Sequence, residues 1–240
     1  MADSDFVDVP VKGLLDAGYL KERAAGIDPR KSSGKVEPGE VRRKADLKPG
    51  IDLAQPATTH FSIVDAEGNV VSMTSSVENA FGSRIMVGGF LLNNQLTDFS
   101  FAPTDADGAI VANAVEAGKR PRSSMSPTIV LNADGSFRLA IGSPGGSRII
   151  GYVAKSLVAV LDWKLPVQEA IDLPHYVNRN GPVDLEKDRG LDAIVPQLEA
   201  MGHTVKVRVM NSGLHGIENV NGVWRGGADP RREGVVLSAE

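Results

Sequence analysis

The pattern of apolar and polar positions predicts two β-hairpins in the last three quarters of the chain. His60–Ala66 and Asn69–Ser75 are strand-like segments separated by Glu-Gly-Asn, a sequence typical of the turn between antiparallel strands. Ser126–Leu131 and Phe137–Ile141 form a second pair, joined by Asn-Ala-Asp-Gly. Both pairs predict neighbouring antiparallel strands.

Helical periodicity follows the second hairpin. Apolar residues recur at helical spacing from Ser147 to Trp163, which predicts a long helix. A shorter helix is predicted at Val167–Asp172. A third is predicted at Leu191–Met201, because Gly202 is a fitting helix stop.

The C-terminal part returns to a strand pattern. His203–Met210 and Ile217–Val220 are predicted strands, and an Asn-Gly turn leads from the latter into Val223–Arg225. Hairpins on both sides of a central helical run predict the α+β class, with antiparallel sheet covered by helices.

Residues 1–57 have a different texture. They contain ten basic and ten acidic side chains, five prolines and six glycines. A short helical pattern runs through Leu14–Ala25, but Arg30–Gly50 is polar and broken. Such a segment buries too little apolar surface to fold alone, and its composition is that of a linker or tail.

Composition and charge exclude several classes of protein and kinds of site. A chain of 240 residues with 42% hydrophobic content can bury one sizeable core. The net charge of −4, without a basic stripe, argues against nucleic acid, and no apolar run is long enough to span a bilayer. The absence of cysteine excludes disulfides and thiol chemistry, and the four histidines lack metal-ligand spacing. The acidic first residues lack the pattern of a targeting signal.

The sequence Pro56-Ala57-Thr58-Thr59-His60 is a candidate processing site at the head of a strand. Cleavage of the Ala57–Thr58 bond would give Thr58 a free α-amine. A threonine in that position carries both a nucleophile and its own base.

Three further clusters have a possible chemical role and a simple structural alternative. Gly142–Ser147 lies between a strand and a helix, where it would bind an anion or an oxyanion, or merely make a turn. It is neither a Walker loop nor a GxGxxG fingerprint. The hydroxyls of Lys119–Pro127 would bind a carboxylate or cap local turns. The polar groups of Leu91–Phe99 would suit an ammonium group or hold a loop together.

Four motifs occur in one order and at suitable spacing, and by them the chain closely resembles the small, catalytic subunit of the γ-glutamyltranspeptidases, which are N-terminal-nucleophile hydrolases. The motifs are Thr58-Thr59-His60, Leu92-Asn93-Asn94-Gln95-x-x-Asp98-Phe99-Ser100, Arg120-Pro121-x-Ser123-Ser124-Met125-Ser126-Pro127 and Gly142-Ser143-Pro144-Gly145-Gly146-Ser147-Arg148. The resemblance covers residues 58–240, including Ala228–Arg231. Residues 1–57 resemble the end of the large subunit, notably Asp5–Pro10.

This resemblance implies a four-layer αββα sandwich, completed by a large subunit that precedes the small one in a single precursor. It also implies autocleavage just before Thr58, a periplasmic or secreted location, and an arginine of the large subunit that clamps the donor carboxylate. The chain would then be a C-terminal fragment, and we expect it to be uncleaved and inactive alone.

The resemblance also assigns catalytic roles. Thr58 would attack the γ-carbonyl of a γ-glutamyl donor such as glutathione, while its α-amine, with a typical pKa of roughly 7.7–8.0, takes the proton. Thr59 would help to hold the N-terminus, and Ser76 falls where the family orients its nucleophile. Gly145 and Gly146 match the oxyanion hole.

The donor would be held by its α-substituents. Ser123 and Ser124 match the contacts to the α-carboxylate, and Glu78, Gln95 and Asp98 match the surroundings of the α-ammonium. Attack by water would give hydrolysis, and attack by an amino acid or peptide amine would give transpeptidation. No metal or organic cofactor is implied.

Two alternatives remain open. Related acylases share the glycine-rich loop and a terminal nucleophile but cleave glutaryl groups, which have no ammonium for the Glu78, Gln95 and Asp98 set to bind. The chain could also be a catalytically silent structural fragment, although packing alone does not require its motif residues. The segment Phe101–Gly118, in the place of the family's substrate lid, has no aromatic residue beyond Phe101, which leaves donor specificity and the ratio of hydrolysis to transfer open.

Overall fold

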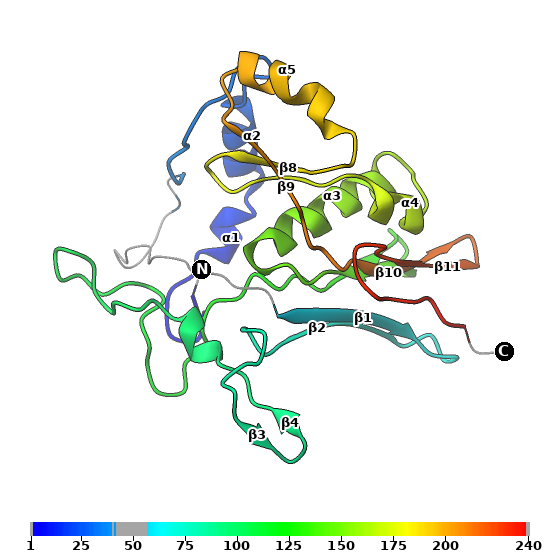
Figure 1. Ribbon diagram of the computed structural model, residues 1–240, viewed down its shortest axis with the longest axis horizontal. Helices are drawn as coiled ribbons and strands as arrows, with labels where there is room; N and C mark the ends of the chain where they lie inside the picture. The colour runs from blue at the N-terminus through cyan, green and yellow to red at the C-terminus, as the bar shows by residue number, and fades with distance from the viewer. Residues whose placement is uncertain (1, 40, 42–56, 239–240) are drawn as a thin grey trace.

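A four-stranded antiparallel sheet forms the centre of the molecule. The computed structural model describes residues 2–39, 41 and 57–238 (Figure 1). The strands are arranged in the order β11-β10-β6-β5. Their bounds are β5 Thr128–Leu131, β6 Phe137–Gly142, β10 His215–Val220 and β11 Val223–Ala228.

Helices α3 (Ile149–Leu161) and α4 (Val167–Asp172) cover one face of this sheet (Figure 1). The buried positions of α3 recur every three or four residues, so that one side of the helix faces the sheet. The core between the layers contains these fully or almost fully buried side chains: Leu139, Ile141, Ile149, Tyr152, Val160, Ile171 and Leu214.

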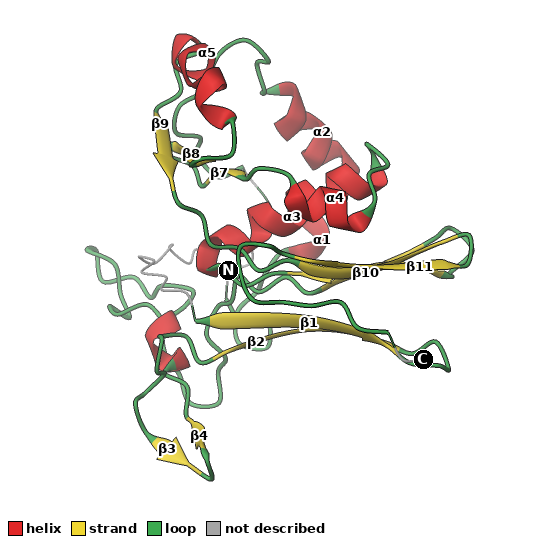
Figure 2. Cartoon of the chain, turned by 45° about the vertical axis from the view of Figure 1, so that its right-hand side comes forward, coloured by secondary structure: helices red, strands yellow, loops and turns green. Residues whose placement is uncertain are grey.

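A hairpin of β1 (Thr58–Val64) and β2 (Val70–Ser76) forms a second layer of strands below the sheet (Figure 2). Its residues pair in an antiparallel register in which Thr58 faces Ser76. Its inward face is largely polar: His60 is buried, and Ser72 Oγ donates to the carbonyl oxygen of Ile141 at 3.3 Å. The described part therefore contains helix, sheet and hairpin in three successive layers.

The outward face of this hairpin is apolar and open to solvent. Phe61 and Ile63 of β1 are 39% and 52% exposed, and Val71 and Met73 of β2 are 45% and 46% exposed. Water contact with four large apolar side chains on one face is unfavourable, and such a surface is typical of one that another structure covers.

The remaining elements surround these layers. A three-stranded sheet of order β7-β8-β9 lies beyond α3 with two short helices nearby (Figure 1). The remaining bounds are α1 Val11–Leu14, α2 Ala17–Ala25, β3 Met86–Val87, β4 Phe90–Leu91, η1 Gln95–Asp98, η2 Gly146–Arg148, β7 Tyr176–Asn178, β8 Val183–Glu186, η3 Leu191–Ile194, α5 Val195–Ala200 and β9 Val205–Arg208.

The structure confirms the two predicted hairpins and the helix at Val167–Asp172. The predicted helices at Ser147–Trp163 and Leu191–Met201 both begin with a 3-10 turn before the α-helix. The prediction of an antiparallel arrangement is wrong for one pair, because β8 and β9 run parallel. The connection between them, through η3 and α5, is long enough to bring the chain back to the same end of the sheet.

The N-terminal segment, residues 1–57, is described in part, which tests some of what its sequence predicts. The helical pattern at Leu14–Ala25 corresponds to α2, and it begins at the last residue of α1; neither helix has a buried residue. The predicted broken stretch Arg30–Gly50 is described only for residues 30–39 and 41, so the rest of it, and Pro56, lie outside the described residues. Within the described residues, no helix combines the length and apolarity needed to cross a membrane.

Candidate active site

Thr58 and Ser76 lie opposite each other at the open end of the β1–β2 hairpin. Thr58 is only 8% exposed, and its Oγ1 donates to Ser76 Oγ at 3.0 Å. Ser76 Oγ also accepts from the Glu78 N–H at 2.9 Å and lies 3.2 Å from the carbonyl oxygen of Ala57, to which it donates. The Val77 N–H donates to the same Ala57 oxygen at 3.3 Å. The threonine hydroxyl and the preceding carbonyl are therefore held by one short network.

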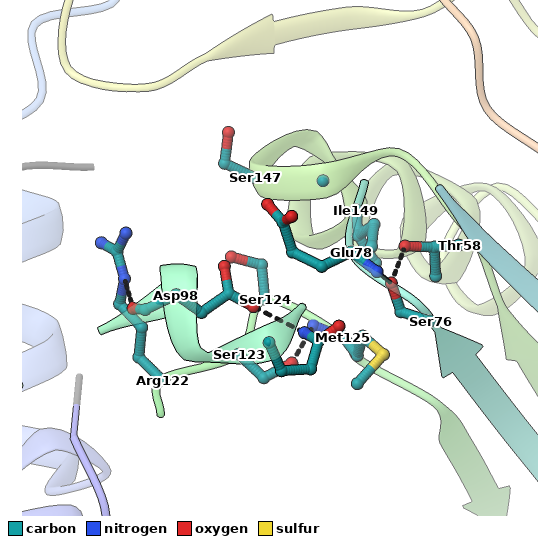
Figure 3. A pocket seen from close by; sticks show the side chains of 12 residues that line it. Thr58, Ser76, Glu78, Asp98, Arg122, Ser123, Ser124, Met125, Ser147 and Ile149 are labelled. Atoms are coloured by element: carbon teal, nitrogen blue, oxygen red, sulfur yellow. Dashed lines mark hydrogen bonds between the residues drawn. The ribbon is translucent and has the colours of Figure 1, made fainter. Parts of the chain in front are cut away.

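A pocket opens beside this network (Figure 3). It brings together most of the predicted site residues: Thr58, Ser76, Glu78, Gln95, Asp98, Ser123, Ser124 and Gly146. Two assigned residues lie outside it. Thr59 is exposed on the opposite side of β1, because successive side chains of a strand point to opposite faces. Gly145 is next to Gly146 but does not line the pocket, and it lies close to Tyr152.

Acidic and amide groups gather at one side of the pocket. Glu78 is 7% exposed and has a φ of 70°, a left-handed conformation that is unusual for a non-glycine residue. Its carboxylate accepts from Asn94 Nδ2 at 2.5 Å. Gln95 Nε2 donates to Asp98 Oδ2 at 2.6 Å, and Gln95 Oε1 is buried with no donor among the described residues. These acceptors suit a cationic group.

Serine hydroxyls and a cation line the pocket beside the acidic groups (Figure 3). Ser123 Oγ accepts from the Met125 N–H at 3.1 Å, which fixes the loop that carries Ser124. Arg122 Nε donates to the backbone carbonyl of Asp98 at 3.3 Å. Together, hydroxyl donors and a guanidinium suit a carboxylate.

Asn94 and Arg122 also belong to the site, although neither is among the residues predicted from the sequence; both lie inside the motifs quoted above. Asn94 bridges two parts of the site, because its Oδ1 accepts from the Asn79 N–H at 2.9 Å while its Nδ2 donates to Glu78. Neither contact has a local sequence signal, since both partners lie about fifteen residues away.

The glycine-rich loop has a backbone that requires glycine. Gly145 has a φ of 135° and Gly146 a φ of 59°. A Cβ atom on Gly145 would lie 2.6 Å from the ring of Tyr152, far inside van der Waals contact. Gly146 lines the pocket and begins the 3-10 turn that leads into α3. The predicted strand-to-helix loop is thus present, and it reaches the pocket beside Thr58.

His60 lies one inward position along β1 from Thr58 and is 3% exposed. Its Nδ1 is 2.8 Å from Thr74 Oγ1, and its ring fills the space beside Gly142. Burial, and then the charge of His215, lower the pKa of His60 to about 4. The ring is therefore neutral near pH 7 and places no charge next to Thr58 on β1.

The geometry suits a substrate with the charges of an amino acid. Acceptors would hold its ammonium group, hydroxyls would hold its carboxylate, and the acyl carbon would lie between the Thr58 hydroxyl and the glycine loop. The described residues contain no group of three or more histidine, aspartate or glutamate side chains that could hold a metal ion.

Comparison with known proteins agrees with this arrangement. Residues 1–239 match the family described as gamma-glutamyltranspeptidase. The chain is 39% identical over 251 residues to the glutathione hydrolase proenzyme of Pseudomonas aeruginosa, an alignment that covers 99% of this chain but 42% of that protein. The chain thus spans about two fifths of the length of this curated relative.

Solved structures of related enzymes are also similar to this chain. A gamma-glutamyltranspeptidase from Pseudomonas nitroreducens complexed with L-DON is similar with a TM-score of 0.66 and 36% identity, covering 76% of this chain and 100% of that chain. A cephalosporin acylase from Bacillus halodurans is similar with a TM-score of 0.81 and 25% identity, covering 100% of this chain and 41% of that chain. Both enzymes have the N-terminal-nucleophile hydrolase fold.

Proposed function

The chain belongs to the gamma-glutamyltranspeptidase family, and on that premise we propose that it is the catalytic part of an enzyme that transfers or hydrolyses γ-glutamyl groups of glutathione and related donors. The observation that carries the proposal is the pocket in which Thr58 Oγ1 donates to Ser76 Oγ at 3.0 Å, beside the carboxylates and the glycine loop. Thr58 is the proposed nucleophile.

In the proposed reaction, Thr58 Oγ attacks the γ-carbonyl carbon while the α-amine of Thr58 takes the hydroxyl proton. Gly145 and Gly146 stabilise the oxyanion with backbone N–H groups, and the amine of the leaving group receives the proton. Water or an acceptor amine then attacks the ester, and Thr58 regains its hydroxyl. Ser76 orients the nucleophile throughout, and Thr59 helps to hold the N-terminus.

The same hydroxyl would carry out autocleavage. Thr58 Oγ1 would attack the carbonyl carbon of Ala57, the peptide bond would become an ester, and water would release residues 1–57 from residues 58–240. The contacts of Ser76 Oγ and the Val77 N–H with the Ala57 oxygen support this step, because both donors would stabilise negative charge on that oxygen. The matched length of the Pseudomonas nitroreducens chain, 76% of this chain, supports the same division.

The proposed partner is a large subunit of the same precursor, of which residues 1–57 would be the end. The exposed apolar face of Phe61, Ile63, Val71 and Met73 supports this, because a further layer would remove it from water. The large subunit would also supply the arginine that holds the donor carboxylate. The proposed location of the protein is periplasmic or secreted, as its membership of the family suggests.

A glutaryl acylase is the second candidate, and similarity to the Bacillus halodurans acylase favours it. The acceptors around Gln95 support a glutamyl donor instead. Gln95 Oε1 is buried without a donor among the described residues, and an unmade hydrogen bond of this kind is costly. A donor ammonium would satisfy it, whereas a glutaryl group would leave it without a partner.

The first experiment replaces the nucleophile. Thr58→Ala, in the protein that carries this chain together with the large-subunit region, is expected to abolish both processing and turnover, since one hydroxyl serves both. Intact mass measures processing, and release of the anilide from a γ-glutamyl anilide measures turnover. Thr204→Ala, at an exposed threonine outside the pocket, is the matched control and should retain both. Normal turnover by Thr58→Ala would contradict the assignment, and an unprocessed wild-type protein would favour the silent structural fragment.

The second experiment separates the two donor classes. Asp98→Asn should weaken binding of a glutamyl donor by about one to two decades, because a charge-assisted hydrogen bond contributes roughly 1.5–3 kcal/mol. A glutaryl donor, which lacks the α-amine, should bind the variant and the wild type alike. Equal losses for the two donors would show that Asp98 does not bind the ammonium group.

A further inference from the structure

Arg232 connects the backbone of Thr58 to a distant loop. Its Nη1 donates to the carbonyl oxygen of Thr58 at 3.1 Å, across 174 positions of sequence. Its Nε donates to Asn211 Oδ1 at 2.9 Å. The guanidinium thus holds the first residue of β1 with one nitrogen and the segment before β10 with another.

The turn that carries Arg232 is anchored in the core. The neighbouring Arg231 has a side chain that is 8% exposed and forms ion pairs with Glu186 at 2.5 Å and with Asp229 at 3.0 Å. The Arg232 N–H donates to the carbonyl oxygen of Asp229 at 3.3 Å, and the Asp229 N–H donates to that of Leu214 at 2.9 Å. Arg232 therefore extends towards Thr58 from a backbone held in a fixed place.

Arg232 also packs beside Gly213, which itself lies next to the glycine-rich loop Gly142–Ser147. A Cβ atom on Gly213 would lie 2.6 Å from Pro144 and 2.9 Å from Cδ of Arg232, so that these three residues leave no free space between them. The Gly213 N–H donates to Ser143 Oγ at 3.3 Å. The segment that Arg232 binds is thus the one on which the loop before Gly145 rests.

We infer that Arg232 is a positioning residue, which holds the backbone of Thr58 in register with the glycine loop and places a positive charge beside the Thr58 nitrogen. This inference rests on the proposed function for its effect on turnover. Attack needs the hydroxyl and the oxyanion donors at fixed separation, and small misplacements of reacting groups reduce rates strongly. A guanidinium that contacts Thr58 and the segment on which the glycine-rich loop rests sets that separation without touching the substrate.

The positive charge of Arg232 should lower the pKa of the Thr58 α-amine. A carbonyl oxygen lies within about 4 Å of the nitrogen of its own residue, so the guanidinium is within about 7 Å of the future α-amine. A cation disfavours protonation of that amine and keeps it available as a base. Among the described residues, the charged groups that line the pocket with Thr58 are the Glu78 and Asp98 carboxylates and the Arg122 guanidinium. Neutral His60 lies on the same strand, and His215 is close enough to lower the pKa of His60.

Hydrogen exchange in the 240-residue chain tests the contact itself. Arg232→Gln should speed amide exchange in the peptide 57–61 by about threefold to tenfold, because one hydrogen bond to the Thr58 carbonyl is lost. Arg30→Gln, at an exposed arginine, is the control and should leave this exchange unchanged. Exchange in α3 reports whether the variant has folded. Should that variant unfold, Arg232→Lys replaces it. One ammonium group does not reproduce the two-nitrogen contact with Thr58 and Asn211, so exchange at 57–61 should still be faster than in the wild type. Unchanged exchange at 57–61 in a folded variant would overturn the inference.

The pH profile of kcat/KM for a γ-glutamyl anilide tests the consequence, in the protein that also carries the large-subunit region. Arg232→Gln should lower kcat and move the acid limb upward by about half to one pH unit. Arg232→Lys should lower kcat but leave the limb in place. An unmoved limb in Arg232→Gln would overturn the charge effect. A wild type without turnover would refute the proposed function instead, and the exchange result would still decide whether Arg232 holds Thr58.

Discussion

The substitution Gly145→Ala tests whether the glycine loop depends on its contact with Tyr152. The added Cβ would lie 2.6 Å from the Tyr152 ring. That ring cannot easily move away, because Tyr152 is 1% exposed and its centroid is 4.3 Å from the ring of His175. The substitution therefore forces either the helix or the loop to shift.

Two costs add to each other in the unshifted structure. A non-glycine residue at a φ of 135° is strained by about 1–3 kcal/mol. Overpacking against the buried ring of Tyr152 costs a further 1–3 kcal/mol or so. A loop that moves to relieve this total withdraws its backbone N–H groups from the oxyanion, which lowers kcat by about two to three decades.

The assay combines thermal unfolding of the chain with turnover of a γ-glutamyl anilide by the processed protein. Gly145→Ala should lower Tm or kcat or both. Gly181→Ala is the matched control, because a Cβ there meets nothing within 4 Å. Adding Tyr152→Leu should restore part of the loss, since the two sites are in contact and their effects are not additive. Wild-type Tm and kcat in Gly145→Ala, or additive effects in the double variant, would refute the reasoning.

Two further predictions concern the β1–β2 hairpin. Because the pKa of His60 lies near 4 in the folded chain and near 6.5 when unfolded, the unfolded state binds more protons, and stability should fall as the pH drops from about 6.5 to 4. Urea unfolding measured across this pH range gives the free energy of unfolding at each pH, and its slope against pH should be smaller in His60→Gln than in the wild type. Separately, we expect the isolated chain to self-associate through the exposed apolar face of this hairpin. Phe61→Ser with Met73→Ser should reduce that association in sedimentation velocity, because both side chains lie on this face. Unchanged association would place the contact elsewhere.

The sequence by itself determined most of the local elements of the fold that surround the pocket. Alternation and a turn sequence predicted the hairpins, and apolar spacing predicted α3 and α4, because these signals arise among residues close in sequence. The family resemblance named eight of the twelve residues that line the pocket, and their roles stay a proposal. The sequence also placed Thr58 at the start of a strand, which the structure bears out.

Only the tertiary structure decided what lies between distant segments. Alternation shows that Phe61 and Ile63 share one face of β1, but it does not say that the polar face with Thr58 turns inward and the apolar face outward. That choice depends on which surface the sheet offers. The contact of Arg232 with Thr58 and the place of Tyr152 behind Gly145 likewise join residues that no local pattern relates. Periodicity determines which side chains lie together on a face, and only packing determines what that face meets.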